Sequence, residues 1–173
     1  MSERIALLNG DENTVPAGLL LAIKQRRGGK LKKIDQLLIH SEAVSRGWNS
    51  MFGELARNCD LDIRIRELAL LRIGILTRAA YEFYQHRLIA LDAGISEVEL
   101  DALSDWSSSP LFDAKERAVL AYTDAMTLTV QVPDEVFDNL RPHFSERQIV
   151  ELTANIAGYN MVARFMEALA LNP

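Results

Sequence analysis

The sequence predicts a soluble, single-domain, all-α protein, and three observations support this. Apolar residues recur at helical spacing, capping residues punctuate the chain at intervals that suit helix ends, and alternating β-branched runs are missing. Residues 127–132 form the only plausible strand, and they adjoin a strong helix. The 173 residues, 49% of them hydrophobic, suit one continuous core. We therefore expect one domain over residues 1–173, with an N-terminal helical extension at about residues 1–40.

Each expected helix has its own start or stop signal. Gly28-Gly29 ends the first helix, and Ser41 can cap the second. The third helix is apolar on all its sides, which predicts a buried central element. In chain order, the expected helices span residues 16–27, 41–57, 61–80, 80–92, 96–103, 113–128, 133–140 and 146–169.

The later helices are defined mainly by capping residues. Gly94 suits the left-handed position that follows a helix, and Pro142 stops the helix that begins after Pro133. Capping boxes pair a short polar residue with Glu or Gln three positions later, and they occur at Ser96/Glu99 and Ser145/Gln148. Asp113, followed by Glu116, starts another helix. Asp60 or Asp62 begins the apolar helix.

Composition excludes several classes of protein. The net charge of −5 argues against nucleic-acid binding, and the short basic run between residues 24 and 33 is interpreted as a solvated loop or helix end. No apolar run approaches the roughly 20 residues that span a bilayer. The first residues lack a secretory pattern, and the single Cys59 can form no intrachain disulfide, so we expect a cytoplasmic protein.

No metal or cofactor site is expected. His40, His86 and His143 are scattered and form none of the paired histidine motifs that bind zinc. Gly28-Gly29 alone is not a phosphate-binding loop.

An acidic residue within the most apolar helix is the first candidate for chemistry. Glu67 shares a helix face with Leu70, Leu71 and Gly74. An ionised carboxylate is costly in such surroundings, so we expect Glu67 to be paired, hydrogen-bonded or protonated. The small Gly74 would let a second helix approach that face closely.

The next helix carries the second candidate group. Glu82 and His86 are four residues apart, so they can contact each other, and histidine exchanges protons readily near neutral pH. Tyr81 adds a hydroxyl, although it points about 100° away from Glu82 around the helix. With Glu67, these residues could form a proton-transfer group between two packed helices. Spacing alone leaves an ordinary ion pair as the alternative.

These residues also carry a resemblance to a known family. The stretches at residues 64–72, 81–86 and 90–95 resemble the signature of the carboxymuconolactone decarboxylase and alkylhydroperoxidase D superfamily. The similarity extends from about Leu31 to the 159–165 stretch. The resemblance implies an all-α fold of that type and a homo-oligomer, as a dimer, trimer or hexamer.

The resemblance separates the two branches of the superfamily. In the alkylhydroperoxidase branch a glutamate is followed by two cysteines and a histidine; here Glu67 and His86 match the outer positions, and Tyr81 matches a position that can hold a second histidine. Ala79 and Glu82 occupy the cysteine positions. Neither can form a thiolate or a disulfide, so the dithiol peroxidase mechanism is not expected. Nearby acidic residues disfavour the thiolate of Cys59.

The decarboxylase branch implies cofactor-free acid–base chemistry on a small lactone or carboxylic acid. Such a site needs cations to hold carboxylates, and Arg78 and Arg164 are the candidates. Asn160 joins them because Tyr159, Asn160 and Arg164 repeat the spacing of Tyr81, Glu82 and His86.

Two alternatives stay open beside this decarboxylase-like enzyme. The first is an antioxidant of the alkylhydroperoxidase or peroxiredoxin type, using Cys59 or an external thiol. The second is an oligomeric protein that binds a small molecule without turning it over.

Overall fold

The computed structural model describes residues 3–10 and 15–173. Over these ranges the protein is helical and has no strand, which confirms the all-α fold predicted from the sequence. Met1 and Ser2, which belong to the expected domain and to the N-terminal segment without a secretory pattern, lie outside the described residues. In the described part of the chain, no helix combines the length and apolar character that crossing a bilayer requires.

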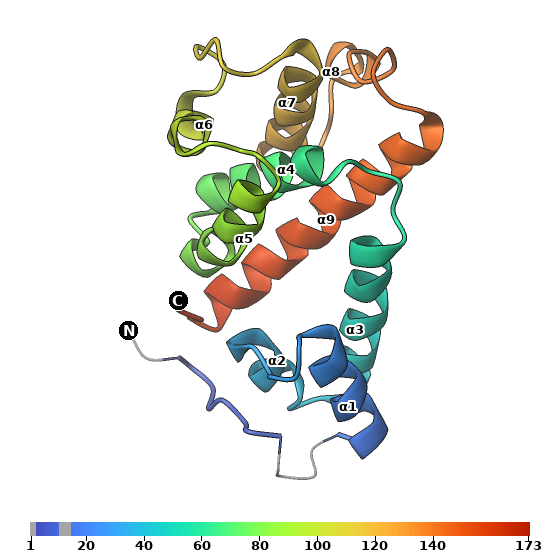
Figure 1. Cartoon of the computed structure of the whole chain (residues 1–173), viewed down its shortest axis with the longest axis vertical. Coiled ribbons are helices and arrows are strands. Elements are labelled where there is room, and N and C mark those ends of the chain that lie inside the picture. Colours follow the sequence, from blue (N-terminus) through green and yellow to red (C-terminus); the bar gives the residue numbers. More distant parts are fainter. Residues whose placement is uncertain (1–2, 11–14) are drawn as a thin grey trace. The chain divides into compact units, whose positions relative to one another are not determined.

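Figure 1 shows the order of the helices along the chain. Their bounds are α1 (Ala17–Arg26), α2 (Lys33–Leu38), α3 (Glu42–Arg57), α4 (Ile63–Thr77), α5 (Ala80–Asp92), α6 (Glu97–Ala102), the 3-10 turn η1 (Leu103–Asp105), α7 (Ala114–Leu128), α8 (Asp134–Asp138) and α9 (Glu146–Ala168). Each expected helix is present within a few residues of its predicted bounds. The short α2 was not predicted.

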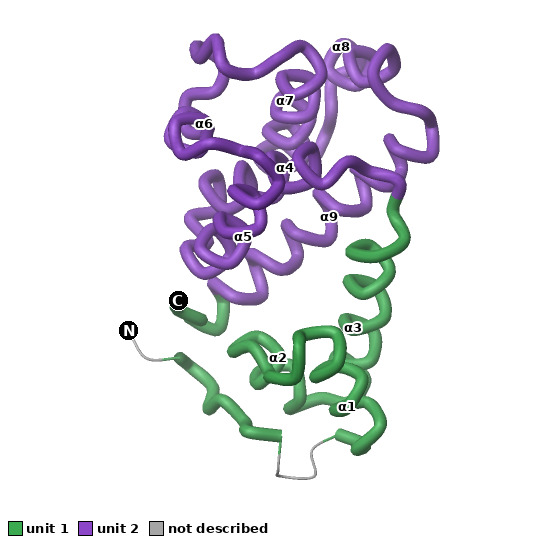
Figure 2. The backbone as a smooth tube through the Cα atoms, in the orientation of Figure 1, with its two compact units in different colours: residues 1–59, 168–172 green, residues 60–167, 173 purple. Residues whose placement is uncertain are grey.

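The chain forms two compact units (Figure 2), one of residues 1–59 with 168–172 and one of residues 60–167 with 173. In the first unit, Leu19, Ile23 and Ile39 belong to a small apolar core. Asp35 is buried in this unit, caps α2 by accepting the backbone N–H of Lys32, and pairs with Arg27 at 3.0 Å. At least one residue of the basic run, Arg27, therefore forms an ion pair within the first unit.

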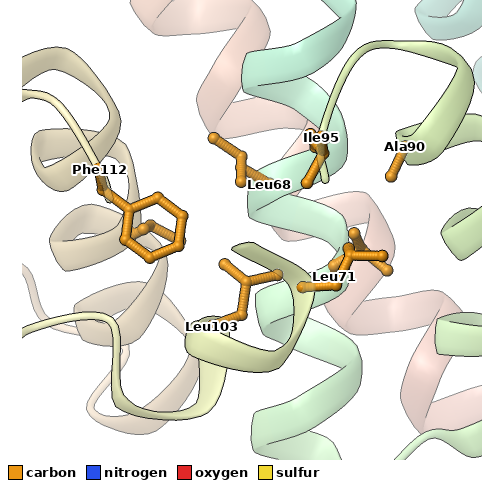
Figure 3. Packing of buried hydrophobic residues seen from close by; sticks show 8 residues of the cluster. Leu68, Leu71, Ala90, Ile95, Leu103 and Phe112 are labelled. Atoms are coloured by element: carbon orange, nitrogen blue, oxygen red, sulfur yellow. The ribbon is translucent and has the colours of Figure 1, made fainter. Parts of the chain in front are cut away.

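The second unit is built around α4, which packs against α5 and α7. Asp62 caps α4 by accepting hydrogen bonds from the backbone N–H groups of Arg64 and Ile65. Of the two residues predicted to begin this helix, Asp62 is therefore the one that does so. The continuous stretch from residue 67 to residue 74 is buried, in agreement with the predicted central helix. Figure 3 shows the apolar cluster around α4, whose buried members are Leu68, Leu71, Ala90, Ile95, Leu100, Leu103, Phe112 and Leu120.

One arginine connects the starts of three helices in this unit. Arg64, in the first turn of α4, pairs with Glu99 of α6 and with Glu116 of α7, the latter at 2.8 Å. Both glutamates also complete the capping boxes of their own helices, the predicted one with Ser96 and a further one with Asp113. Hydrogen bonds from Arg64 therefore tie two capping boxes to the helix that carries the candidate site.

A close contact and a tight turn set the position of α5 beside α4. A Cβ at Gly74 would lie 3.3 Å from the Cβ of Phe83 and 3.4 Å from its backbone nitrogen. Arg78 ends α4 in the left-handed conformation (φ 57°, ψ 30°), and the N–H of Ala79 donates to the carbonyl of Gly74 at 2.9 Å. The small residue at position 74 thus permits the close approach of α5 expected from the sequence.

Replacing Gly74 with leucine is expected to lower the free energy of unfolding by about 1–3 kcal/mol, because the new side chain meets the backbone of α5. The measurement is urea unfolding followed by far-ultraviolet circular dichroism.

Gly47→Leu is the matched control. Gly47 also lies inside a helix, but it is exposed and no heavy atom lies within 4 Å of where its Cβ would stand. This substitution is expected to be neutral or to stabilise the protein by up to about 1 kcal/mol, because glycine is a poor helix former. Equal losses in the two variants would contradict the close-packing argument.

Candidate functional site

Glu67 lies in α4 with no exposed surface and has two charged partners. Its Oε1 accepts a hydrogen bond from Nε of Arg66 at 3.2 Å, and its Oε2 lies 2.6 Å from Nδ1 of His86. A carboxylate in an apolar interior needs such compensation, because its transfer from water is costly. The expectation that Glu67 has partners is therefore confirmed.

His86 lies between two carboxyl groups. Its Nδ1 contacts Glu67, and its Nε2 lies 3.0 Å from Oε1 of Glu82, one turn earlier on α5. The imidazole side chain is 12% exposed and the side chain of Arg66 is 16% exposed, so both reach solvent more than Glu82, which is 5% exposed. We call Arg66, Glu67, Glu82 and His86 the charged cluster.

The electrostatic surroundings change the proton affinity of the imidazole. Burial opposes the charged ring, but the hydrogen bonds with Glu67 and Glu82 and the charges of both carboxylates outweigh it and raise the pKa of His86 to about 9. The ring is therefore held as an imidazolium at neutral pH.

An aromatic ring from a distant part of the sequence completes the surroundings of His86. Tyr159 of α9 meets the imidazole edge to face, with ring centroids 5.1 Å apart and planes at 88°. Such a contact restricts the tilt of the imidazole ring. Helices α4 and α5 thus supply the charged side chains, and α9 supplies the aromatic ring that contacts His86.

Two residues near the motif lie outside the charged cluster. Tyr81 is buried in the first turn of α5, next to Glu82. Arg78 is exposed at the end of α4, and among the described residues its side chain makes no hydrogen bond or ion pair. The structure thus brings together Glu67, Glu82 and His86, as expected, and leaves Arg78 apart from them.

Asn160 and Arg164 of α9 are engaged with each other. The amide nitrogen of Asn160 donates to the hydroxyl of Thr127 at 3.0 Å, while its Oδ1 accepts from Nη1 of Arg164 at 2.6 Å. Arg164 is exposed, whereas Asn160 is buried. These contacts link α9 to α7.

Sequence reasoning assigned no role to Arg66 or Tyr159, although both contact the charged cluster. Arg66 directly precedes Glu67, and a buried carboxylate is a reason to look for a cation beside it. Tyr159 matches Tyr81 in the repeated spacing described above, but its contact with His86 is seen only in the structure.

The residues at the two cysteine positions have clear structural roles. Ala79 is fully buried at the start of α5, and Glu82 holds the imidazole of His86. Cys59 is partly buried and belongs to the first unit. The described residues contain no group of three or more His, Cys, Asp or Glu side chains arranged to hold a metal ion.

Comparison with known proteins supports the resemblance seen in the sequence. The model of the carboxymuconolactone decarboxylase family matches residues 42–125. The uncharacterized protein YnjA of Escherichia coli is 39% identical over 75 residues, which are 43% of this chain. The match covers only 41% of the length of YnjA.

Solved structures share the fold. A protein of unknown function from Agrobacterium tumefaciens, provisionally named an antioxidant defence protein AhpD, superposes with a TM-score of 0.70 at 28% identity, covering 73% of this chain and 88% of that one. The debrominase Bmp8, as a cysteine-to-alanine variant in complex with 2,3,4-tribromopyrrole, superposes with a TM-score of 0.80 at 18% identity, covering 98% of this chain and 91% of that one.

The motif residues, the family match and the shared fold agree. The chain belongs to the carboxymuconolactone decarboxylase and AhpD-like superfamily, as a member with Ala79 and Glu82 at the two cysteine positions.

Proposed function

We propose that the chain is an enzyme that performs cofactor-free acid–base chemistry on a small lactone or carboxylic acid, with the imidazolium of His86 as the proton donor. The observation that carries this proposal is the placement of one ring between two carboxyl groups, with Glu67 at 2.6 Å and Glu82 at 3.0 Å. Histidine is the side chain best suited to proton transfer near neutral pH.

Counting protons supports the choice of an acid over a base. A neutral imidazole carries one N–H and can donate to only one of its two carboxylate neighbours. An imidazolium carries two, so both short contacts become donor–acceptor pairs. The resting site therefore holds a proton on His86 that it can give to a substrate.

The reaction that this arrangement suits best is a decarboxylation with protonation. The bond between the substrate carbon and its carboxylate breaks, carbon dioxide leaves, and the electron pair moves into the conjugated carbonyl system. His86 then delivers its proton to carbon, and solvent returns a proton to the ring. Glu67 keeps the ring oriented, and Glu82 stabilises its charge until transfer.

Thiol-based peroxide reduction has less support. It needs a peroxidatic and a resolving sulfur, and Ala79 and Glu82 provide neither. Glu82 is instead engaged with His86 at the position where a cysteine would stand.

The first test uses carboxymuconolactone in heavy water. The wild-type protein is expected to release carbon dioxide and to leave a deuteron on the product carbon, as detected by proton NMR. His86→Gln is expected to lower the rate about 10²-fold or more, because the proton donor is lost.

His143→Gln serves as the control, because this histidine lies outside the charged cluster, and it should keep the wild-type rate. Turnover by His86→Gln at the wild-type rate would show that His86 is not the acid. A wild-type protein that neither releases carbon dioxide nor incorporates deuterium would exclude this substrate class.

The second test measures the protonation of His86 directly. In protein labelled with ¹⁵N-histidine, the imidazole is expected to titrate near pH 9 in the wild type and at a lower pH in Glu82→Gln, which loses one of the two carboxylates. Activity that needs the imidazolium should fall over the same pH range in each variant.

The titration also has a consequence for stability, with a definite sign. The folded protein binds the proton of His86 more tightly than the unfolded chain does, because the ordinary pKa of histidine is 6.5. The stabilisation of the folded state that results is fully present below pH 6.5 and is lost as the pH rises to about 9. If the imidazole of His86 titrated near pH 6.5 in the wild type and in Glu82→Gln alike, the imidazolium assignment would be contradicted.

A further inference from the structure

Arg66 uses only one edge of its guanidinium group within the protein. Its Nε donates to Oε1 of Glu67 at 3.2 Å, and among the described residues this is the only side-chain hydrogen bond or ion pair of Arg66. The terminal Nη1 and Nη2 groups keep their donors. The side chain is nevertheless mostly buried, with 16% of its surface exposed.

Arg66 and His86 hold the two oxygens of the same carboxyl group. Arg66 contacts Oε1 of Glu67 and His86 contacts Oε2, so the carboxyl group fixes the guanidinium beside the proposed proton donor. Glu67 itself has no exposed surface, whereas both cations reach solvent. A molecule that approaches the site therefore meets mainly the two cations, because Glu67 is fully buried and Glu82 is only 5% exposed.

Carboxylates are the natural partner of a guanidinium presented in this way. Its terminal N–H groups form a planar fork that matches two carboxylate oxygens, and such charge-assisted bonds are stronger where water is largely excluded. Arg66 offers such a fork at the end of a side chain that is mostly buried. Arg78, by contrast, is exposed, and Arg164 is exposed and bonded to Asn160.

We propose that Nη1 and Nη2 of Arg66 bind the carboxylate of a small organic acid and place its neighbouring carbon beside His86. This inference rests on the proposed function and narrows it: the substrate is a small carboxylate, and Arg66 is its anchor in place of Arg78 and Arg164.

Binding of benzoate tests this proposal without turnover. Isothermal titration calorimetry gives its Kd, and the ring resonances of ¹⁵N-labelled histidine report whether it lies beside His86. Benzoate is expected to shift the resonances of His86 in a saturable way. Benzamide, of the same shape but uncharged, is expected to bind roughly tenfold more weakly or worse.

Substitutions then locate the anchor. Arg66→Gln is expected to raise the Kd for benzoate roughly tenfold or more, and Arg66→Lys, which keeps the charge but loses the fork, by less. Arg87→Gln is the matched control, because Arg87 lies next to His86 in the sequence and pairs with the exposed Glu97. It should bind benzoate as the wild type does.

Three results would overturn the proposal: an unchanged Kd in Arg66→Gln, equal affinity for benzamide and benzoate, or benzoate binding that leaves His86 unperturbed. If Arg66→Gln does not fold, Arg66→Lys and the comparison of benzoate with benzamide in the wild type decide the matter.

Failure of the anchor and failure of the proposed function are distinguishable. His86→Gln lacks the proton donor but keeps Arg66, so it should still bind benzoate in the calorimeter. Loss of turnover with retained binding supports both proposals. Unchanged turnover in His86→Gln overturns only the proton-donor role.

Discussion

The hydrogen bond between Glu67 and His86 is the constraint on which the candidate site depends. A carboxylate inside the most apolar helix of the chain has to be compensated, and the imidazole at 2.6 Å does this across a helix pair. The contact requires α5 to lie close to α4, which Gly74 permits and the left-handed turn at Arg78 directs. Packing and charge therefore favour the same arrangement of the two helices.

Much of this arrangement could be predicted from the sequence because it is local. The spacing of Glu82 and His86 is one helical turn, and the buried position of Glu67 follows from the apolar residues around it. Capping boxes such as Ser96/Glu99 are likewise formed within four residues, and the structure contains them. Features formed by residues close together in the sequence could therefore be predicted from the sequence.

The remaining features depend on contacts between distant segments. Tyr159 of α9 meets His86 of α5 through a contact between rings that are far apart in the sequence, and no pattern within either helix encodes that contact. The partners of Asn160 could not be anticipated for the same reason, since Thr127 comes from α7. The short α2 was missed because its buried Asp35 looks like a surface residue until its ion pair with Arg27 is seen.

The first turn of α5 has a consequence for how this superfamily can diversify. Ala79 and Glu82 stand where the peroxidase branch has its sulfur atoms, while the scaffold beneath them is held by Gly74 and by the Glu67–His86 contact. Two point mutations in this turn can thus remove or supply a thiol pair, while the contacts that set the crossing of α4 and α5 lie elsewhere. Descent within the superfamily is for this reason a good guide to architecture and a poor guide to the reaction.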